Sequence, residues 1–226
     1  SACLVGSEMC IRDRGKTALL GPNGAGKSTL FSLCSGASAP RSGRIILGTA
    51  EASPRTLRRR VGLMAQTVRA MAGLTVREQV AYCGWLMGLS TREAVARADK
   101  MIADVDLADK ADDRASRISG GQLRRVGLAQ VLIGQPEVLL LDEPTAGLDP
   151  AQRMRFREVL ERIPDNRVTV VSTHQVDDLT DGYDRVIVLS AGRIVFDGSP
   201  EEFLDLAPED APHRAEAAYL SLMVDE

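Results

Sequence analysis

A glycine-rich segment at residues 21–29, GPNGAGKST, has the residue types and spacing of a phosphate-binding loop. It matches the pattern G-x-x-x-x-G-K-S/T between an expected strand at 17–20 and an expected helix at 27–35. Backbone N–H groups of such a loop surround nucleotide phosphates; Lys27 would bridge the β- and γ-phosphates and the Ser28 hydroxyl would hold Mg²⁺. A glycine-rich turn that only caps a helix is the alternative. The candidate phosphate-binding residues are Gly21, Pro22, Asn23, Gly24, Ala25, Gly26, Lys27, Ser28 and Thr29.

Residues 138–143, VLLLDE, form an apolar run that ends in two carboxylates. Acids are compatible with a buried strand only at its exit, where a ligand or metal compensates for lost hydration. Asp142 fits a carboxylate that orients Mg²⁺ through water, and Glu143 fits a general base that polarises an attacking water molecule. Two solvated acids at a strand end are the alternative, which the neighbouring phosphate loop disfavours.

Residues 119–122, SGGQ, predict a second helix start with two glycines and therefore a second anion-binding site. A chain that binds one nucleotide needs one phosphate loop, so this second site should serve another purpose. The Ser/Thr-x-x-Glu patterns at 75–78 and 90–93 are capping boxes, which predict two further helix starts between these motifs.

The elements that must position these residues alternate as in a parallel α/β protein, with a mostly parallel sheet interrupted by a helical insertion at about 67–135. Gly192 and Arg193 predict a hairpin to 194–196, and Ser199 is expected to cap the final helix. The other expected strands lie at 44–47, 61–65, 138–141, 168–172 and 185–189, and the other expected helices at 56–60, 119–134 and 150–163.

The composition argues against a protein that grips bare nucleic acid, because 28 Lys and Arg against 31 Asp and Glu give a net charge of −3. The Arg58–Arg60 run is accordingly expected to be a solvated face. No window approaches the ~18 consecutive apolar residues of a membrane span, so a role at a membrane would require another chain to cross it. The cysteines show no metal-ligand spacing and are expected to be reduced cytosolic thiols.

Residues 1–14, SACLVGSEMCIRDR, show neither strand nor helix periodicity. Residues 9–14 resemble the conceptual translation of a transposon end used in sequencing libraries. We expect that roughly residues 1–14 are non-native read-through and that native sequence begins near Gly15. An unusual but native N-terminal strand is the alternative.

The order and spacing of these motifs resemble those of the ATP-binding cassette (ABC) ATPases over residues 15–226, nearly the whole chain. The resemblance implies a P-loop NTPase core with an inserted helical subdomain, which is the ABC ATPase fold. It is carried by residues 21–29, Gln66, 119–122, 138–143, the Gly147-Leu-Asp149 turn and His174.

In this family two cassettes pair head-to-tail, and each ATP lies between the phosphate loop of one chain and the signature helix of the other. The resemblance therefore implies that Ser119, Gly120, Gly121 and Gln122 act on ATP held by a second subunit. Ile118 stands where the family often has Leu, a mild substitution.

Three further residues acquire roles by the same resemblance. Gln66 would reach Mg²⁺ and the attacking water, and His174 would contact the γ-phosphate and hold Glu143 in place. Asp149 would lie in the turn that crosses the dimer interface, with a plain turn and helix cap as the alternative. The resemblance thus implies a Mg²⁺-dependent ATPase with Glu143, His174 and Gln66 as catalytic residues and Ser28, Gln66 and Asp142 at the metal.

The family stacks adenine on an aromatic residue from a strand that precedes the phosphate loop. This chain has no Tyr, Phe or Trp before Phe31. Either the native aromatic residue is missing from this sequence, or binding of the base is weak.

The implied function is an ATP-hydrolysing subunit that drives a separate transmembrane permease from the cytoplasmic face of the cell membrane. It would pair with a second ATP-binding subunit, and the complete set of site residues makes a homodimer workable, with a heterodimer as the alternative. Residues 73–89, which include Tyr82, Trp85 and Met87, look like the exporter branch and are a candidate docking region. The alternative is that Trp85 and Met87 fill the core of the helical subdomain.

Two other functional classes are weighed against this one. A soluble ABC ATPase acting on ribosomes or DNA would carry tandem cassettes or a long coiled coil, and the 92 residues from Lys27 to Ser119 contain no heptads. A non-hydrolysing regulatory cassette is disfavoured because Glu143 and His174 are both present.

Overall fold

The computed structural model describes residues 2–4, 9–11, 15–164, 166–174, 176 and 182–223, with only the backbone given for 2–4 and 9–11. In this part of the chain, six strands form the central sheet in the order β10-β9-β3-β8-β7-β6. All neighbours are parallel except β9 and β10, which form the expected hairpin. The strands are β3 (Gly15–Leu20), β6 (Val61–Met64), β7 (Val138–Asp142), β8 (Val168–Thr173), β9 (Arg185–Ser190) and β10 (Arg193–Gly198).

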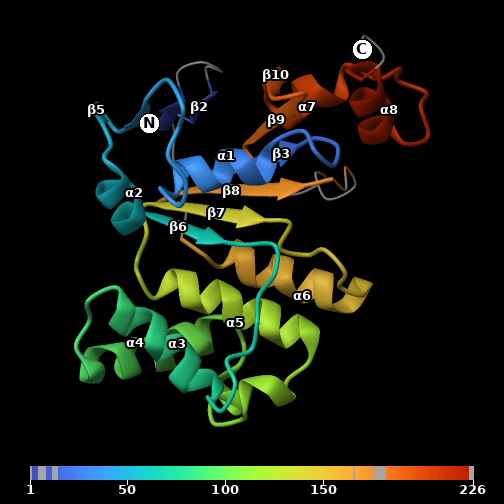
Figure 1. Cartoon of the computed structure of the whole chain (residues 1–226). Helices are drawn as coiled ribbons and strands as arrows, with labels where there is room; N and C mark the ends of the chain where they lie inside the picture. The colour runs from blue at the N-terminus through green and yellow to red at the C-terminus, as the bar shows by residue number, and fades with distance from the viewer. Residues whose placement is uncertain are drawn as a thin grey trace.

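Helices cover both faces of this sheet (Figure 1). A strand covered on both faces must be apolar at every position, and β7 shows this pattern. Leu139 and Leu141 pack into the core shared with the large helical layer, while Val138 and Leu140 pack into the core on the opposite face. The unbroken apolar run before Asp142 is therefore a consequence of double coverage.

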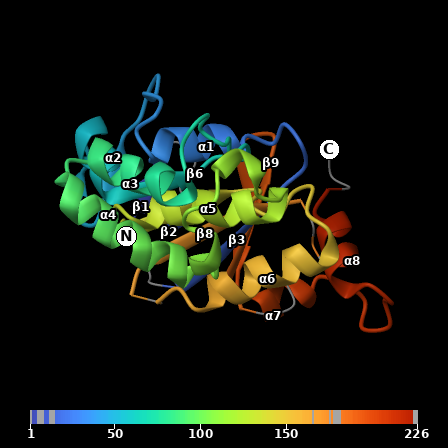
Figure 2. The same ribbon diagram turned by 90° about the horizontal axis from the view of Figure 1, so that it is seen from below.

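One face of the sheet carries α1 and α2 together with a small antiparallel sheet of order β2-β1-β4-β5, and the other carries α3–α6 (Figures 1 and 2). The small sheet comprises β1 (Ala2–Leu4), β2 (Met9–Ile11), β4 (Ile45–Leu47) and β5 (Ala50–Glu51). The helices are α1 (Lys27–Cys34), α2 (Pro54–Arg60), α3 (Val76–Leu86), α4 (Thr91–Asp104), α5 (Gly120–Leu132), α6 (Pro150–Glu161), α7 (Pro200–Leu204) and α8 (Arg214–Ser221).

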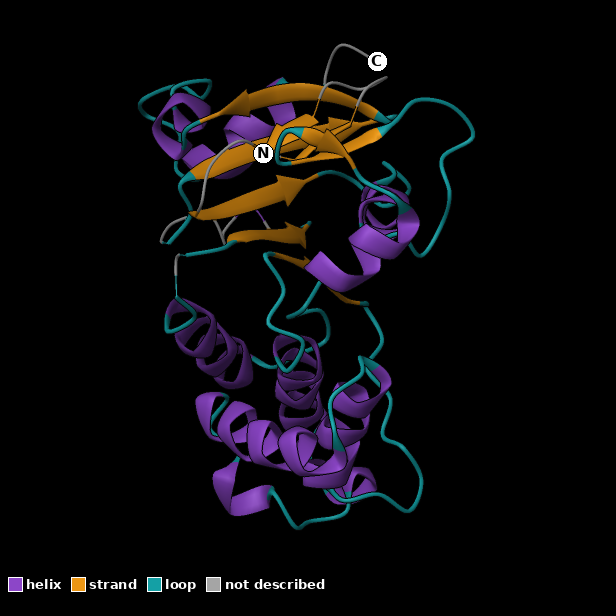
Figure 3. Cartoon of the chain, turned by 90° about the vertical axis from the view of Figure 1, so that its left-hand side faces the viewer, coloured by secondary structure: helices purple, strands orange, loops and turns teal. Residues whose placement is uncertain are grey.

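The segment between β6 and β7 contains α3, α4 and α5 and two short 3₁₀ turns, η1 (Ala108–Lys110) and η2 (Ala115–Arg117). Figure 3 shows these helices gathered at one end of the molecule and the strands at the other. A shared core of buried side chains, including Val80, Ile102 and Leu128, joins them to the sheet. The α/β fold with its helical insertion agrees with the sequence prediction.

Capping residues in the sequence determine where several of the helices begin. The predicted capping boxes are present at α3 and α4, where Thr75 and Ser90 accept hydrogen bonds from the backbone of Glu78 and Glu93. Ser199 caps α7 in the same way, but this helix is not the last one described, because α8 follows it. The prediction missed α8 because its N-terminal position has no side-chain cap hydrogen bond and therefore no capping signature.

Two expectations about surfaces can be compared with the structure. Trp85 and Met87 do not fill the core of the helical insertion: each is 54% exposed, and the Trp85 ring stacks on that of Tyr82. Arg58 and Arg59 are exposed, as expected of a solvated face, whereas Arg60 forms a two-point ion pair with Glu137.

No helix in the described part of the chain combines the length and apolar character needed to cross a lipid bilayer. Residues 1–14 show no strand periodicity in the sequence, yet the backbone of residues 2–4 and 9–11 forms β1 and β2, and β1 pairs with β4. The read-through expected for residues 1–14 stays a prediction, and so does the expected effect on adenine binding.

Candidate functional site

The predicted site residues emerge at one edge of the sheet because the parallel strands end in register. Leu20 pairs with Thr173, and Asp142 pairs with Ser172. The residues that follow these strands, namely the glycine-rich loop, Glu143 and His174, must therefore leave the sheet side by side. The carboxyl edge of an open parallel sheet is where such folds bind ligands.

The glycine-rich loop adopts backbone conformations that disfavour other residues. Gly26 has φ of 105° directly before α1, and a Cβ at Gly21 would lie 2.4 Å from the carbonyl oxygen of Leu189. These glycines allow the loop to fold closely over the sheet edge with its N–H groups near the start of α1.

Lys27 is a buried cation, with a side chain only 6% exposed. Its Nζ donates hydrogen bonds to the carbonyl oxygens of Gly21, at 2.6 Å, and Pro22, at 3.2 Å. The nearest carboxylate oxygen, Oε1 of Glu143, lies 3.6 Å away. The loop therefore holds a positive charge in the position where the sequence predicted a phosphate contact.

Glu143 lies at the centre of the site. Its side chain is 8% exposed and its backbone is left-handed, with φ of 46°. The Oε2 atom lies 2.5 Å from Nδ1 of His174, while Oε1 faces Lys27. The structure thus brings the expected general base, the expected histidine and the loop lysine together within one chain.

Asp142 is buried, and Ser172 holds it in place. The Ser172 hydroxyl donates to Oδ1 of Asp142 at 2.6 Å and accepts the backbone N–H of Glu143 at 2.9 Å. Sequence analysis did not select Ser172, because a serine near the end of an apolar strand has no distinguishing pattern. Only the register of β7 against β8 places it between the two acids.

A cavity of about 250 Å³ lies over the loop, and its lining includes Lys27, Ser28, Thr29, Gln66 and Glu143. Ser28 and Gln66 are exposed. They supply a hydroxyl and an amide oxygen to this cavity, ligand types that Mg²⁺ takes in proteins, whereas Asp142 is buried at the end of β7 and is not one of the lining residues. A buried ammonium, a helix start and hard oxygen donors around one hollow fit the phosphates and Mg²⁺ of a nucleotide.

Arg124, on α5, is a second residue that sequence analysis missed. Its guanidinium donates to the backbone carbonyl of Gln66 and, at 3.3 Å, to that of Ala146. Loss of hydration lowers the pKa of Arg124 from its ordinary value. The Arg124 side chain therefore connects the helical insertion to the two loops that follow β6 and β7. Arg124 belongs to none of the motifs recognised in the sequence.

The second predicted anion site is arranged differently. Ser119 accepts the backbone N–H of Gln122, and the Gln122 side chain accepts that of Ser119, so both complete a capping box at the start of α5. Asp149 accepts the N–H of Gln152 as the cap of α6, which matches the alternative that sequence analysis left open. Among the described residues, the lining of the cavity over the loop includes none of these side chains.

Gly121 packs closely against α6. A Cβ at this position would lie 2.3 Å from Oε1 of Gln152, an atom that is buried without a hydrogen-bond partner. Gln152 therefore occupies the space that any larger residue at position 121 would need, which connects the start of α5 to the turn that contains Asp149.

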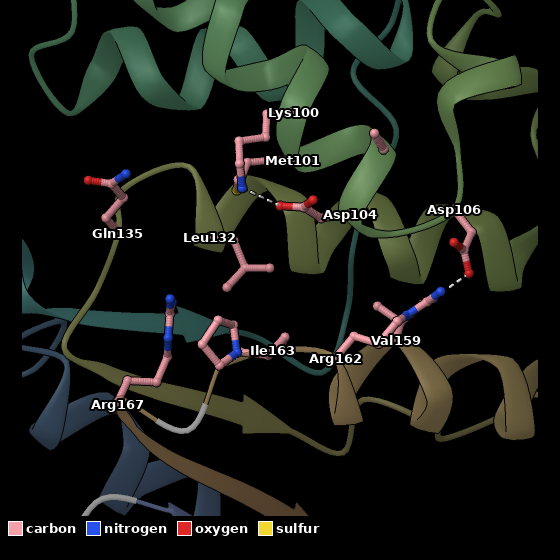
Figure 4. A pocket seen from close by; sticks show the side chains of 12 residues that line it. Lys100, Met101, Asp104, Asp106, Leu132, Gln135, Val159, Arg162, Ile163 and Arg167 are labelled. Atoms are coloured by element: carbon pink, nitrogen blue, oxygen red, sulfur yellow. Dashed lines mark hydrogen bonds and ion pairs between the residues drawn. The ribbon is translucent and has the colours of Figure 1, made fainter.

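A larger cavity, of about 440 Å³, lies between the ends of α4, α5 and α6 (Figure 4). Lys100 pairs with Asp104 one turn further along α4, and Arg162 pairs with Asp106, so most of the charges that line the cavity are neutralised locally. Arg167 also lines it, directly before β8 and hence at the end of that strand opposite His174. This cavity is separate from the edge where the predicted site residues meet.

Comparisons with known proteins show what the sequence and fold of this chain are similar to. The family model described as ABC transporter matches residues 4–146. The chain is 37% identical over 203 residues to the energy-coupling factor transporter ATP-binding protein EcfA2 of Lacticaseibacillus paracasei, covering 85% of this chain and 70% of that protein. It is 42% identical over 189 residues to the cobalt import ATP-binding protein CbiO of Rhodobacter capsulatus, covering 80% and 68%.

Among solved structures, cbiO1 from Clostridium perfringens, described as part of the ABC transporter complex cbiONQ, superposes with a TM-score of 0.76. The two chains are 31% identical, and the match covers 88% of this chain and 82% of that one.

Proposed function

The chain belongs to the ABC transporter family of ATP-binding proteins, and from that premise we propose that it hydrolyses ATP within a dimer to drive a separate membrane-embedded permease. The observation that carries the proposal is the contact of Glu143 with His174 beside Lys27 and the glycine-rich loop. These groups lie at the edge of the sheet where a nucleotide would place its phosphates.

Glu143, His174 and Lys27 would each have a separate role in ATP hydrolysis. Bound Mg²⁺ and ATP would supply the reactive γ-phosphoryl group and the cation that neutralises its charge. Glu143 accepts the proton of the attacking water, and His174 fixes the orientation of its carboxylate through Oε2. Lys27 provides positive charge at the loop, so catalysis is positioning and charge stabilisation without a covalent intermediate.

The dimer is supported by the incompleteness of the second anion site. Ser119 and Gln122 are exposed or partly exposed and begin a helix, and the side chain of each accepts the backbone N–H of the other. A helix start of this kind binds an anion, and a second copy of this chain would bring its own loop and nucleotide to it. Each nucleotide would then lie between two subunits.

The membrane partner is supported by the relatives and by an exposed apolar surface. The relatives are ATP-binding proteins of transporters, which disfavours the ribosome- or DNA-acting alternative. On α3 and directly after it, Tyr82, Trp85, Leu86 and Met87 are each more than 40% exposed. A cluster of large apolar side chains of this kind suits a protein partner, and we place the permease there, at the inner face of the membrane.

The direction of transport proposed here is import. Sequence analysis predicted the exporter branch from residues 73–89, but that expectation finds no support, because CbiO is named for cobalt import and EcfA2 for an energy-coupling factor transporter. Selectivity for the transported molecule would be set by the permease.

The test of the ATPase is Glu143→Gln, which removes the proton acceptor and keeps the size of the side chain. We expect ATP binding to persist, hydrolysis to fall by about 10²-fold or more, and an ATP-bound dimer to accumulate on a sizing column. Glu137→Gln is the matched control, since Glu137 lies just before β7, as Glu143 lies just after it, and its side chain is 57% exposed. Turnover by Glu143→Gln at the wild-type rate would refute the assignment of the base.

A further inference from the structure

We propose that Ser172 is a positioning residue for hydrolysis, whose single hydroxyl sets both the carboxylate of Asp142 and the backbone of Glu143. The inference deepens the proposed function and rests on it. Ser172 lies in β8, is fully buried, and pairs in register with Asp142 across the sheet.

The direction of both hydrogen bonds follows from chemistry. A backbone N–H can only donate, so Ser172 Oγ must be the acceptor for Glu143, at 2.9 Å. The hydroxyl has one proton, and this proton is directed to Oδ1 of Asp142 at 2.6 Å, where an ionised carboxylate can only accept. The Ser172 hydroxyl thus donates its proton to the carboxylate of Asp142 and accepts the backbone N–H of Glu143 with a lone pair.

The first bond fixes the orientation of Asp142. With Oδ1 held by Ser172, rotation of the carboxyl group about its terminal bond would break a short hydrogen bond to an ionised group. The other oxygen, Oδ2, is thereby kept in one direction. The orientation of a carboxylate beside a metal depends on partners of this kind, and their loss typically costs 10–100-fold in metal affinity or activity.

The second bond acts on the backbone of Glu143. The backbone of Glu143 is left-handed, with φ of 46°, a conformation that is unfavourable for a residue with a Cβ atom. The Ser172 hydroxyl anchors the N–H of that residue and so favours the conformation that directs the carboxylate between Lys27 and His174. Ser172 touches neither of these two residues in the hydrogen bonds described, so it acts through Glu143.

Ser172→Ala removes the hydroxyl and leaves the strand intact. We expect hydrolysis to fall about 10–100-fold, the Mg²⁺ concentration for half-maximal activity to rise several-fold, and the Glu143 amide of the nucleotide-free protein to exchange its hydrogen faster. Mn²⁺ binding with ADP, followed by electron paramagnetic resonance, should weaken in parallel. Mn²⁺ is the probe because it accepts the same oxygen ligands.

Thr169→Val is the matched control. Thr169 lies three residues earlier in β8, is 2% exposed, and pairs with Leu139 rather than with an acid. It should lower the melting temperature and leave the kinetics, Mn²⁺ binding and Glu143 exchange unchanged.

A merely structural serine would behave like Thr169. If Ser172→Ala lowers the melting temperature but leaves either the metal dependence or the Glu143 exchange at the wild-type value, the proposal is overturned. Failure of the proposed function has a different result, because the wild-type protein itself would then not hydrolyse ATP. The exchange and Mn²⁺ measurements would still test Ser172 in that case.

Discussion

The two halves of the site differ in how far one chain completes them. In the phosphate-loop half, made of residues 21–29 with Asp142, Glu143, Ser172 and His174, side chains already contact one another. In the signature half, made of residues 119–122 with Asp149, each side-chain hydrogen bond only caps the helix on which it lies. The first half is assembled within one chain, whereas the second leaves its helix start open, as the proposed dimer requires.

The largest expected effect on nucleotide binding and hydrolysis follows from removing the positive charge of Lys27 from the phosphate-loop half. Lys27→Ala leaves a buried acid, Glu143, without its nearby cation and the loop without its ammonium. We expect nucleotide binding by the monomer to be largely lost and hydrolysis to fall by roughly 10²–10³-fold, the usual scale for one electrostatic group at a reacting centre. Titration with a fluorescent ATP analogue and a phosphate-release assay measure the two effects.

Lys100→Ala is the control for that change, because Lys100 is 71% exposed and pairs only with Asp104 on its own helix. It should bind and hydrolyse ATP as the wild type does. Retained nucleotide binding in Lys27→Ala would contradict the view that this half binds phosphate without help from the partner.

The second prediction separates the two halves. Ser119→Arg places a bulky cation at the start of α5, so the partner's nucleotide could not approach, while the loop of the same chain is untouched. We expect normal ATP binding per monomer and no detectable hydrolysis. Ser90→Arg removes the equivalent cap from α4, where the Ser90 hydroxyl accepts the Glu93 N–H, and should cost similar stability, about 1 kcal/mol, with full activity.

The outcome that would overturn this comparison is loss of nucleotide binding by the monomeric Ser119→Arg protein. Such a result would mean that the signature half serves the nucleotide of its own chain. The same measurement made on Ser90→Arg shows whether a lost cap alone could be responsible.

The third prediction concerns Gly121. An added methyl group would collide with Gln152, so Gly121→Ala should lower both stability and hydrolysis. Gln152→Ala on that background makes room and should restore the melting temperature. We expect hydrolysis to remain at least several-fold reduced, because the methyl group would still cover the helix start. Full recovery of hydrolysis would instead confine the role of Gly121 to packing within the chain.

In the phosphate-loop half, the residues that belong to a sequence motif could be predicted, whereas the residues that act only through contacts with distant segments could not. The glycine pattern and the two acids after an apolar strand are local features, because loop geometry and strand burial restrict the residues at those positions. Ser172 and Arg124 were missed because their roles arise from hydrogen bonds between residues that lie 22 to 58 positions apart in the sequence. In the fold, the capping boxes of α3 and α4 were found, whereas α8, which has no side-chain cap, was not.

The alternative interpretation of Trp85 and Met87, as residues that fill the core of the helical insertion, was wrong for a related reason. Large apolar side chains usually fill cores, but the inner face of α3 is already occupied by Val76, Val80 and Ala81. The helical period then places Trp85 outside, and only the assembled subdomain shows it.

The fourth prediction tests the link between the halves. Arg124→Gln loses the guanidinium contacts to Gln66 and Ala146, so the loops after β6 and β7 are no longer tied to α5. We expect a loss of about 1–2 kcal/mol in the free energy of unfolding and a several-fold lower turnover rate. Arg124→Lys, which keeps the charge without the fork of donors, should lie between the two. Unchanged turnover in both variants would show that the hydrogen bonds of Arg124 to Gln66 and Ala146 do not contribute to hydrolysis.

The smallest effect concerns the caps of the helical insertion, where α3 and α5 have the same geometry with different charge. Glu78 closes the box at α3, whereas neutral Gln122 closes it at α5. The hydrogen bond from the Thr75 backbone N–H to the carboxylate, and then the bond with the Thr75 side chain, lower the pKa of Glu78 below its ordinary value of 4.5. A pKa lowered by folding means that the ionised carboxylate stabilises the native state above that value and that this contribution is lost as the pH falls through the native pKa.

Glu78→Gln gives α3 the type of cap that α5 already has. At pH 7 its melting temperature should be slightly below that of the wild type, and the difference should shrink as the pH falls through the lowered pKa of Glu78, because the carboxyl group of the wild type then becomes neutral. Glu216→Gln is the control, because Glu216 lies in the first turn of α8 without a side-chain cap hydrogen bond. A difference in melting temperature that does not depend on pH would mean that the charge is not its cause. The comparison also gives a physical reason for Gln122: a neutral cap leaves the positive end of α5 uncompensated, which suits the proposed binding of a second subunit's nucleotide at this helix start.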